Sequence, residues 1–214
     1  MIENEGVEIP AAGQLEEIIR ESCQMDPLRA AAAADLLYIV QRFELFPGWL
    51  AIPHPWKRYS VQATAFRLSV PSTGHPMIGH DIIYNHPMNH GAALGRAAQR
   101  DFLIYAESIR QIDGGVYISI GSAVMSPMVF EKSLSISQNV AIQQGQHIDH
   151  HFILVNDLAE STWDWSKGEP PEENPAYYQR YNKSFSRMGG ELRYLQADNR
   201  DFLLCLTQLL GTRQ

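Results

Sequence analysis

The feature that most constrains the fold is a helix–strand–helix succession between residues 91 and 136. Apolar residues recur three or four positions apart from Leu94 to Ile112, which predicts a long amphipathic helix. Asp113-Gly114-Gly115 ends that helix, and the apolar run Val116–Ile120 follows as a buried strand. Gly121-Ser122 then turns the chain, and Ser126-Pro127 opens the next helix. This succession is typical of a parallel sheet whose strands alternate with helices.

The rest of the chain continues the same alternation. Further strands are expected at residues 152–155 and 192–195, and residues 77–84 hold a β-compatible core interrupted by Gly79 and His80. Before them, residues 1–10 look like a loose tail, and two helices fill most of the remaining sequence up to Pro47. We therefore predict an α/β protein with a mostly parallel sheet and helices on both faces, preceded by a helical N-terminal segment. The expected domains are residues 1–46, helical, and 47–214, α/β.

Composition excludes several classes of partner. The formal net charge is −7 and the four lysines are scattered, so a nucleic-acid partner is not expected. No apolar run reaches the roughly 18 residues needed to span a bilayer, so no membrane partner is expected either. Cys23 and Cys205 are interpreted as small buried apolar residues rather than a disulfide, which suits a cytoplasmic protein.

A histidine-rich stretch precedes the long helix. Four of the eight histidines, including His75, His80 and His86, fall between residues 75 and 90, together with Asp81 and Asn85. These donor types suit zinc, iron or manganese, but their spacing matches no metalloenzyme signature, and no metal site is assigned. The alternatives are a ligand or catalytic pocket with histidine as proton carrier, and histidines that only hydrogen-bond the backbone.

The strand ends carry the other candidate groups. Gly121-Ser122 follows a buried strand and precedes a helix, an arrangement suited to anion binding, although a simple tight turn is the alternative. Asp157 follows the next strand, and ligands bind beyond the carboxyl ends of parallel strands. Neither a G-x-G-x-x-G nor a G-x-x-x-x-G-K-[ST] motif is present. The loop around Trp163 and Trp165 is interpreted as a lid or subunit contact, or as packing on its own domain.

Several motifs resemble an uncharacterised bacterial family that is associated with the deoxyhypusine-synthase-like, Rossmann-type NAD-binding fold. They are Pro53-His54-Pro55-Trp56-Lys57-Arg58-Tyr59-Ser60, Gly79-His80-Asp81, His86-Pro87, Gly115–Ala123 and Asn174-Pro175. Between residues 80 and 131 the chain is also similar to deoxyhypusine synthase itself. The resemblance implies that His80 and Asn85 line a substrate pocket and that Gly121-Ser122 approaches NAD.

The chain departs from that enzyme at one decisive position. Deoxyhypusine synthase works through a lysine imine, and this chain has no lysine between Lys57 and Lys132. Arg96 and Arg100 lie on the matching helix, and arginine forms imines poorly because it stays protonated. Deoxyhypusine synthesis is therefore not expected.

The sequence thus predicts a small-molecule enzyme or ligand-binding protein with a histidine-rich pocket at the carboxyl-terminal edge of a Rossmann-like sheet, with NAD as a possible cofactor and a homo-oligomeric state. The expected catalytic residues are His80, His86 and Asp81, and the expected ligand-binding residues are His75, Asn85, Gly121, Ser122 and Asp157. The alternative is a non-catalytic oligomeric scaffold that has lost the cofactor-binding half of the fold.

Overall fold

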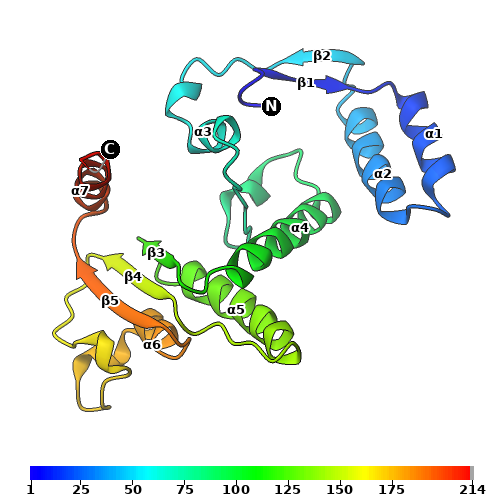
Figure 1. Cartoon of the computed structure of the whole chain (residues 1–214). Coiled ribbons are helices and arrows are strands. Elements are labelled where there is room, and N and C mark those ends of the chain that lie inside the picture. The colour runs from blue at the N-terminus through cyan, green and yellow to red at the C-terminus, as the bar shows by residue number, and fades with distance from the viewer. Residues whose placement is uncertain (213–214) are drawn as a thin grey trace. The chain divides into compact units, whose positions relative to one another are not determined.

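The computed structural model describes residues 1–212 as an α/β protein with seven α-helices and five strands (Figure 1). The chain divides into two compact units, Met1–Asp101 and Phe102–Gln214, and the long helix α4 (Gly91–Arg110) contains the division. Each unit has its own hydrophobic core. No helix within residues 1–212 combines the length and hydrophobicity that a membrane crossing requires.

The N-terminal unit is built on a β-ribbon and two long helices. Its elements are β1 (Gly6–Ile9), α1 (Ala12–Ser22), α2 (Pro27–Arg42), β2 (Gly48–Ala51) and α3 (Val61–Arg67). The Asp26 carboxylate accepts a hydrogen bond from the Arg29 backbone N–H, and Ser60 caps α3 in the same way, as their positions in the sequence predict. Leu15, buried on α1, packs with Ala33 and Val40 of α2.

The first ten residues and the loop after α2 differ from expectation. β1 and β2 pair antiparallel, with Gly6 opposite Ala51 and Ile9 opposite Gly48. Residues 1–10 are therefore not a loose tail, because their backbone groups find partners across the ribbon. This pairing joins the two sides of the expected boundary between residues 46 and 47, and the compact units divide instead after Asp101.

The expected strand at residues 77–84 is wrong. The chain there forms turns and a short 3-10 helix, Ile82–Asn85. Ile78 and Ile82 are each 84% exposed, so their apolar side chains do not mark a strand in a core. Gly79 has a φ of 78°, and the Asp81 carboxylate accepts from the Met77 N–H, so local turn chemistry overrides β propensity.

The C-terminal unit contains a three-stranded parallel sheet in the order β3-β4-β5. The sequence places all three strands correctly and identifies the helices between them. The elements are β3 (Val116–Ile120), α5 (Met125–Gln143), β4 (Phe152–Asp157), α6 (Arg180–Phe185), β5 (Glu191–Gln196) and α7 (Asn199–Gly211). Asp198 caps α7, with its carboxylate accepting from the Arg200 N–H.

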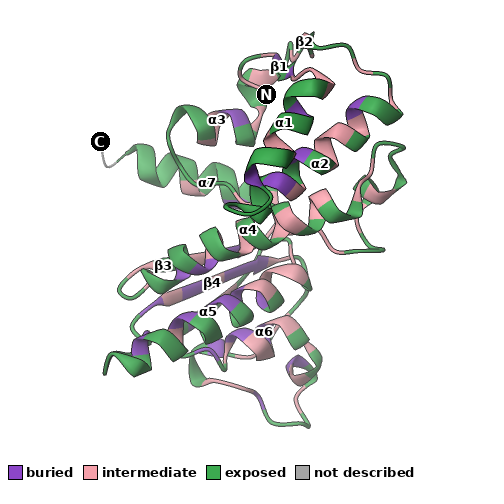
Figure 2. Cartoon of the chain, turned by 90° about the vertical axis from the view of Figure 1, so that its right-hand side faces the viewer, coloured by how far each residue is buried: buried purple, intermediate pink, exposed green. Residues whose placement is uncertain are grey.

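The core of this unit lies on one face of the sheet. The register aligns Tyr117 with Ile153 and Leu192. These side chains share a face because aligned residues of neighbouring strands point to the same side of a sheet. Phe130 of α5 and Phe185 of α6 are fully buried against this face. Figure 2 shows the buried residues along β4 and on α5 and α6. On the opposite face, Val116 is 60% and Leu195 41% exposed.

The tryptophan loop packs within its own unit. The Trp165 indole is buried in the core, and its Nε1 donates to the Ser161 Oγ at 2.9 Å. Trp163 donates to the Gly168 carbonyl at 2.8 Å. Of the two interpretations of this loop, packing on its own domain accounts for both rings.

The two cysteines are not bonded to each other, but both are exposed. The expectation that they are buried apolar residues is therefore wrong. Cys23 follows the end of α1, and its Sγ donates to the Arg20 carbonyl, while Cys205 lies on an exposed part of α7.

Candidate functional site

A cavity of about 620 Å³ lies at the amino-terminal edge of the sheet in the C-terminal unit. The end of α4, the end of α5 and the segment leading into β4 surround it, through residues that include Arg110, Asp113, Gln144, His147, Asp149 and His150. Its volume falls in the range of roughly 300–1,000 Å³ that small-molecule sites occupy.

Asp113 anchors the segment that enters β4. One carboxylate oxygen accepts the backbone N–H of Asp149 at 3.1 Å and that of His150 at 2.8 Å. The His150 N–H in particular lowers the pKa of the Asp113 carboxyl, because a donated hydrogen bond favours the ionised form. Asp113 is therefore negatively charged at neutral pH.

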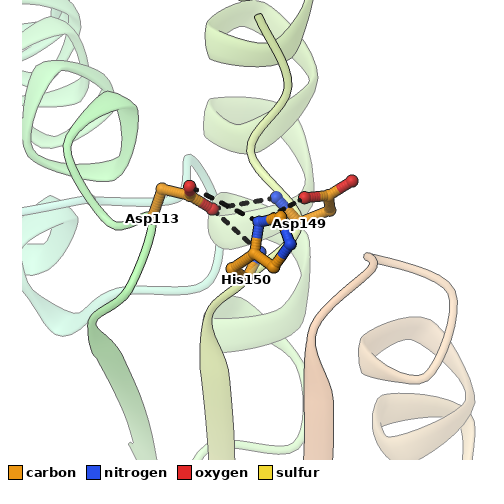
Figure 3. Close-up of side chains that lie close together, drawn as sticks. All are labelled: Asp113, Asp149 and His150. Atoms are coloured by element: carbon orange, nitrogen blue, oxygen red, sulfur yellow. Dashed lines mark hydrogen bonds and ion pairs between the residues drawn. The ribbon is translucent and has the colours of Figure 1, made fainter.

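Three of the side chains that line the cavity lie close together (Figure 3). The His150 Nδ1 lies 2.8 Å from an oxygen of Asp149 and 3.7 Å from an oxygen of Asp113. One donor atom from each residue lies within 4.8 Å of the other two, and within residues 1–212 this is the one such group of three metal-ligand side chains. An imidazole nitrogen with two carboxylate oxygens is a donor set that zinc and manganese accept.

Burial on both sides holds this segment in place. Ile148 is buried, and its N–H donates to the Gln138 side chain at 2.8 Å. His151 is buried at the other end, whereas Asp149 and His150 between them are exposed. The segment therefore presents Asp149 and His150 to solvent because its neighbours are fixed in the core.

The electrostatic environment of the cavity favours a cation. The helix C-termini of α4 and α5 border it, and such ends carry partial negative charge. Arg110 also borders the cavity, but its guanidinium donates to both oxygens of Glu107 at 2.7–2.8 Å, which offsets its charge. Two carboxylates and two helix C-termini thus surround the His150 imidazole.

The predicted residues of the carboxyl-terminal edge lie where parallel topology requires. β3 and β4 are neighbours, so Gly121 and Asp157 end at the same edge, and the Gly121 N–H donates to the Asn156 carbonyl at 3.1 Å. Ser122 follows there, and its Oγ accepts the Ser126 N–H at 3.0 Å at the start of α5. The Asp157 carboxylate accepts from the two backbone N–H groups that follow it. The Ser122 and Asp157 side chains thus both have local backbone partners.

Asn156 at this edge was missed by sequence reasoning. Its side chain is 1% exposed, and its Nδ2 donates to the Ala197 carbonyl at 3.2 Å and to the Asn199 Oδ1 at 2.8 Å. Its own Oδ1 has no hydrogen-bond partner. A lone asparagine at a strand end gives no signal in the sequence that distinguishes it from a turn residue.

The predicted histidine cluster belongs to the N-terminal unit. His75 contacts the Thr73 hydroxyl at 3.0 Å, and burial lowers its pKa. The His86 Nδ1 accepts the Met88 N–H at 3.1 Å, whereas His80 and Asn85 are exposed. The His86 imidazole is thus bonded to the backbone, as one of the two alternatives for this cluster expects. The catalytic role of His80, His86 and Asp81 stays a prediction.

No family model, curated protein or solved structure matches this chain. The resemblance to the deoxyhypusine-synthase-like family therefore also stays a prediction.

The aspartate–histidine group around Asp149 was not singled out from the sequence. The signal was present in Gln146-His147-Ile148-Asp149-His150-His151, where three histidines and an aspartate precede a strand. Its partner Asp113 lies 36 residues earlier than Asp149 in the chain, and the two meet only because β3 and β4 are adjacent and parallel.

Proposed function

We propose that the C-terminal unit binds a divalent metal ion through Asp113, Asp149 and His150, with a small polar molecule in the adjoining cavity. The observation that carries this proposal is that three donor atoms lie within 4.8 Å of one another on side chains that line the cavity. The imidazole favours zinc or manganese over magnesium, which prefers oxygen donors alone.

Three protein ligands leave coordination positions open, as in catalytic rather than structural metal sites. A ligand in the cavity would therefore reach the metal directly. A metal in this position supplies Lewis-acid chemistry and lowers the pKa of bound water, which suits hydrolysis of a small polar substrate. His147 lines the same cavity and supplies a further group able to carry a proton.

Isothermal titration of the metal-free protein with Zn²⁺ and with Mn²⁺ tests the site. We expect one ion per chain, and we expect Asp149→Asn and His150→Gln each to weaken binding at least tenfold, because even outer-shell changes cost that much. Asp201→Asn, an exposed aspartate on α7, is the matched control and should bind normally. The proposal is wrong if the wild type takes up no metal, or if the wild type, the two site variants and the control variant all bind the metal with equal affinity.

A second candidate is a nucleotide site at the carboxyl-terminal edge of a Rossmann-like sheet, as the sequence predicts. The unpartnered Asn156 Oδ1 favours it, because a buried acceptor without a donor costs free energy unless a ligand or water supplies one. The order β3-β4-β5, with a turn at Gly121 between β3 and α5, is the arrangement of one half of a Rossmann sheet. An unchanged thermal midpoint with NAD(H) and with ATP would remove this candidate.

A further inference from the structure

The two edges of the parallel sheet differ in chemistry. β5 carries Glu191 and Arg193, both exposed and ion-paired at 2.6 Å. Charged side chains on an edge strand oppose pairing with another chain. The β5 edge is therefore protected.

The β3 edge has no such protection. Its sequence, Val-Tyr-Ile-Ser-Ile, contains no charged residue, and Val116 is 60% exposed. Within residues 1–212, β4 is the only strand that pairs with it. An uncharged apolar edge strand is a template for a further strand, and natural proteins cover such edges.

We propose that β3 pairs antiparallel with β3 of a second copy of this chain, which joins two three-stranded sheets into one six-stranded sheet. Two-fold symmetry makes this contact self-complementary, because each strand offers the same uncharged side chains to the other. In an antiparallel pair centred on Ile118, Val116 of one copy lies opposite Ile120 of the other on the same face. No like charges meet across the seam.

Helix α7 begins next to the end of β3 and offers further exposed apolar residues. Its first residue, Asn199, lies so close to Gly121 that a side chain there would overlap the Asn199 amide. Figure 1 shows α7 beyond the carboxyl ends of β4 and β5. Leu203, Leu209 and Leu210 are 46%, 65% and 60% exposed along it.

The available area limits the size of the contact. β3 is about 16 Å long and α7 about 20 Å long, and each is about 10 Å wide with its side chains, so together they offer at most about 400 Å² per copy in projection. A standard specific interface buries about 800 Å² per partner. The available area is about half the standard area, so we expect a weak dimer.

Sedimentation equilibrium across the micromolar range tests this contact. We expect the wild-type mass to rise from one chain toward two. We expect Val116→Lys to raise the dissociation constant at least tenfold, because it places a charge opposite the apolar Ile120 of the other copy. Ile142→Lys, a 51% exposed isoleucine on α5, is the matched control and should dimerise as the wild type does. Circular dichroism checks that each variant is folded.

Hydrogen exchange of the wild-type protein tests the strand directly, independently of any variant. The β3 amides should exchange more slowly as concentration rises, and the β5 amides should not change. A wild type that stays one chain in mass, equal dimerisation of Val116→Lys, or concentration-independent β3 exchange would each overturn the proposal. None of these measurements depends on metal binding.

Discussion

At the scale of single residues, His151 shows how the core controls the candidate metal site. It precedes β4 and is 2% exposed, with neither ring nitrogen hydrogen-bonded. Its ring meets Phe130 edge-on at 6.0 Å. His151 is thus held as a neutral, apolar-like side chain one position after the exposed His150.

This burial predicts a pH-dependent stability. Burial lowers the pKa of His151 below its ordinary value of 6.5, against the smaller opposing effects of Asp113 and Asp149, and burial lowers the pKa of His75 as well. As the pH falls below about 6.5, these two imidazoles take up protons in the unfolded chain but not yet in the folded chain. The free energy of unfolding is therefore higher above that pH and decreases as the pH falls below it.

Urea unfolding between about pH 5.5 and 7.5, above the carboxylate range, measures this effect. His151→Phe should flatten the slope, leaving the part due to His75. If His151→Phe keeps the wild-type dependence of the free energy of unfolding on pH, the His151 imidazole is not the source of that dependence.

Gly190 packs against the same histidine and gives a sharper test. Its φ is 65°, and a Cβ there would overlap both the carbonyl oxygen and the ring of His151. Gly189 has a similar φ of 70°, but its Cβ would meet only ordinary contacts at 3.6 Å or more.

Gly189→Ala should therefore cost about 1–2 kcal/mol of backbone strain alone. Gly190→Ala should cost about 3 kcal/mol or more, because overpacking adds to the strain. Equal losses of free energy of unfolding in the two variants would show that the His151 contact relaxes freely.

At the scale of elements, α5 packs against both the sheet and α4. Phe130 is fully buried, with its ring 4.2 Å from that of Tyr117 on β3. Ser137 donates to the Ala106 carbonyl at 3.0 Å and ties α5 to α4. Helix α5 thus contacts β3 through Phe130 and α4 through Ser137.

Phe130→Ala should lower the free energy of unfolding by about 3–5 kcal/mol, because it removes a large buried ring and leaves a cavity. Met128→Ala, on the same helix but 51% exposed, should change it by less than about 0.5 kcal/mol. Chemical denaturation of both variants makes the comparison. Similar effects would mean that the C-terminal core is more adaptable than its burial indicates.

Elements were predicted well where local signals agreed. The strands 116–120, 152–157 and 191–196 carry apolar runs bounded by glycine or polar turns, and capping residues marked α2, α3 and α7. The failures were β1, β2 and the stretch 77–84. A four-residue ribbon strand depends on its partner rather than on its own pattern, so neither of its halves is visible alone.

At the scale of the whole molecule, the division after Asp101 predicts independent folding. The core residues of the C-terminal unit all lie beyond Phe102, and α4 contributes Ile109 to them. A fragment of residues 91–214 should therefore fold cooperatively by circular dichroism and bind Zn²⁺ as the full chain does.

A fragment of residues 116–214 is the matched control. It lacks α4 and Asp113, so it should lose both the cooperative transition and the metal site. If the longer fragment fails to fold, the C-terminal unit is not autonomous.

The sequence by itself determined the α/β class, the three parallel strands and the caps of the main helices, because these depend on periodicity and on neighbours a few residues away. It also led to the carboxyl-terminal edge, where Gly121, Ser122 and Asp157 do lie. Only the tertiary structure brought Asp113 to Asp149 and His150, left β3 as an uncharged edge, and divided the chain after Asp101. These features depend on which strands become neighbours, and long-range pairing leaves no periodic trace along the chain.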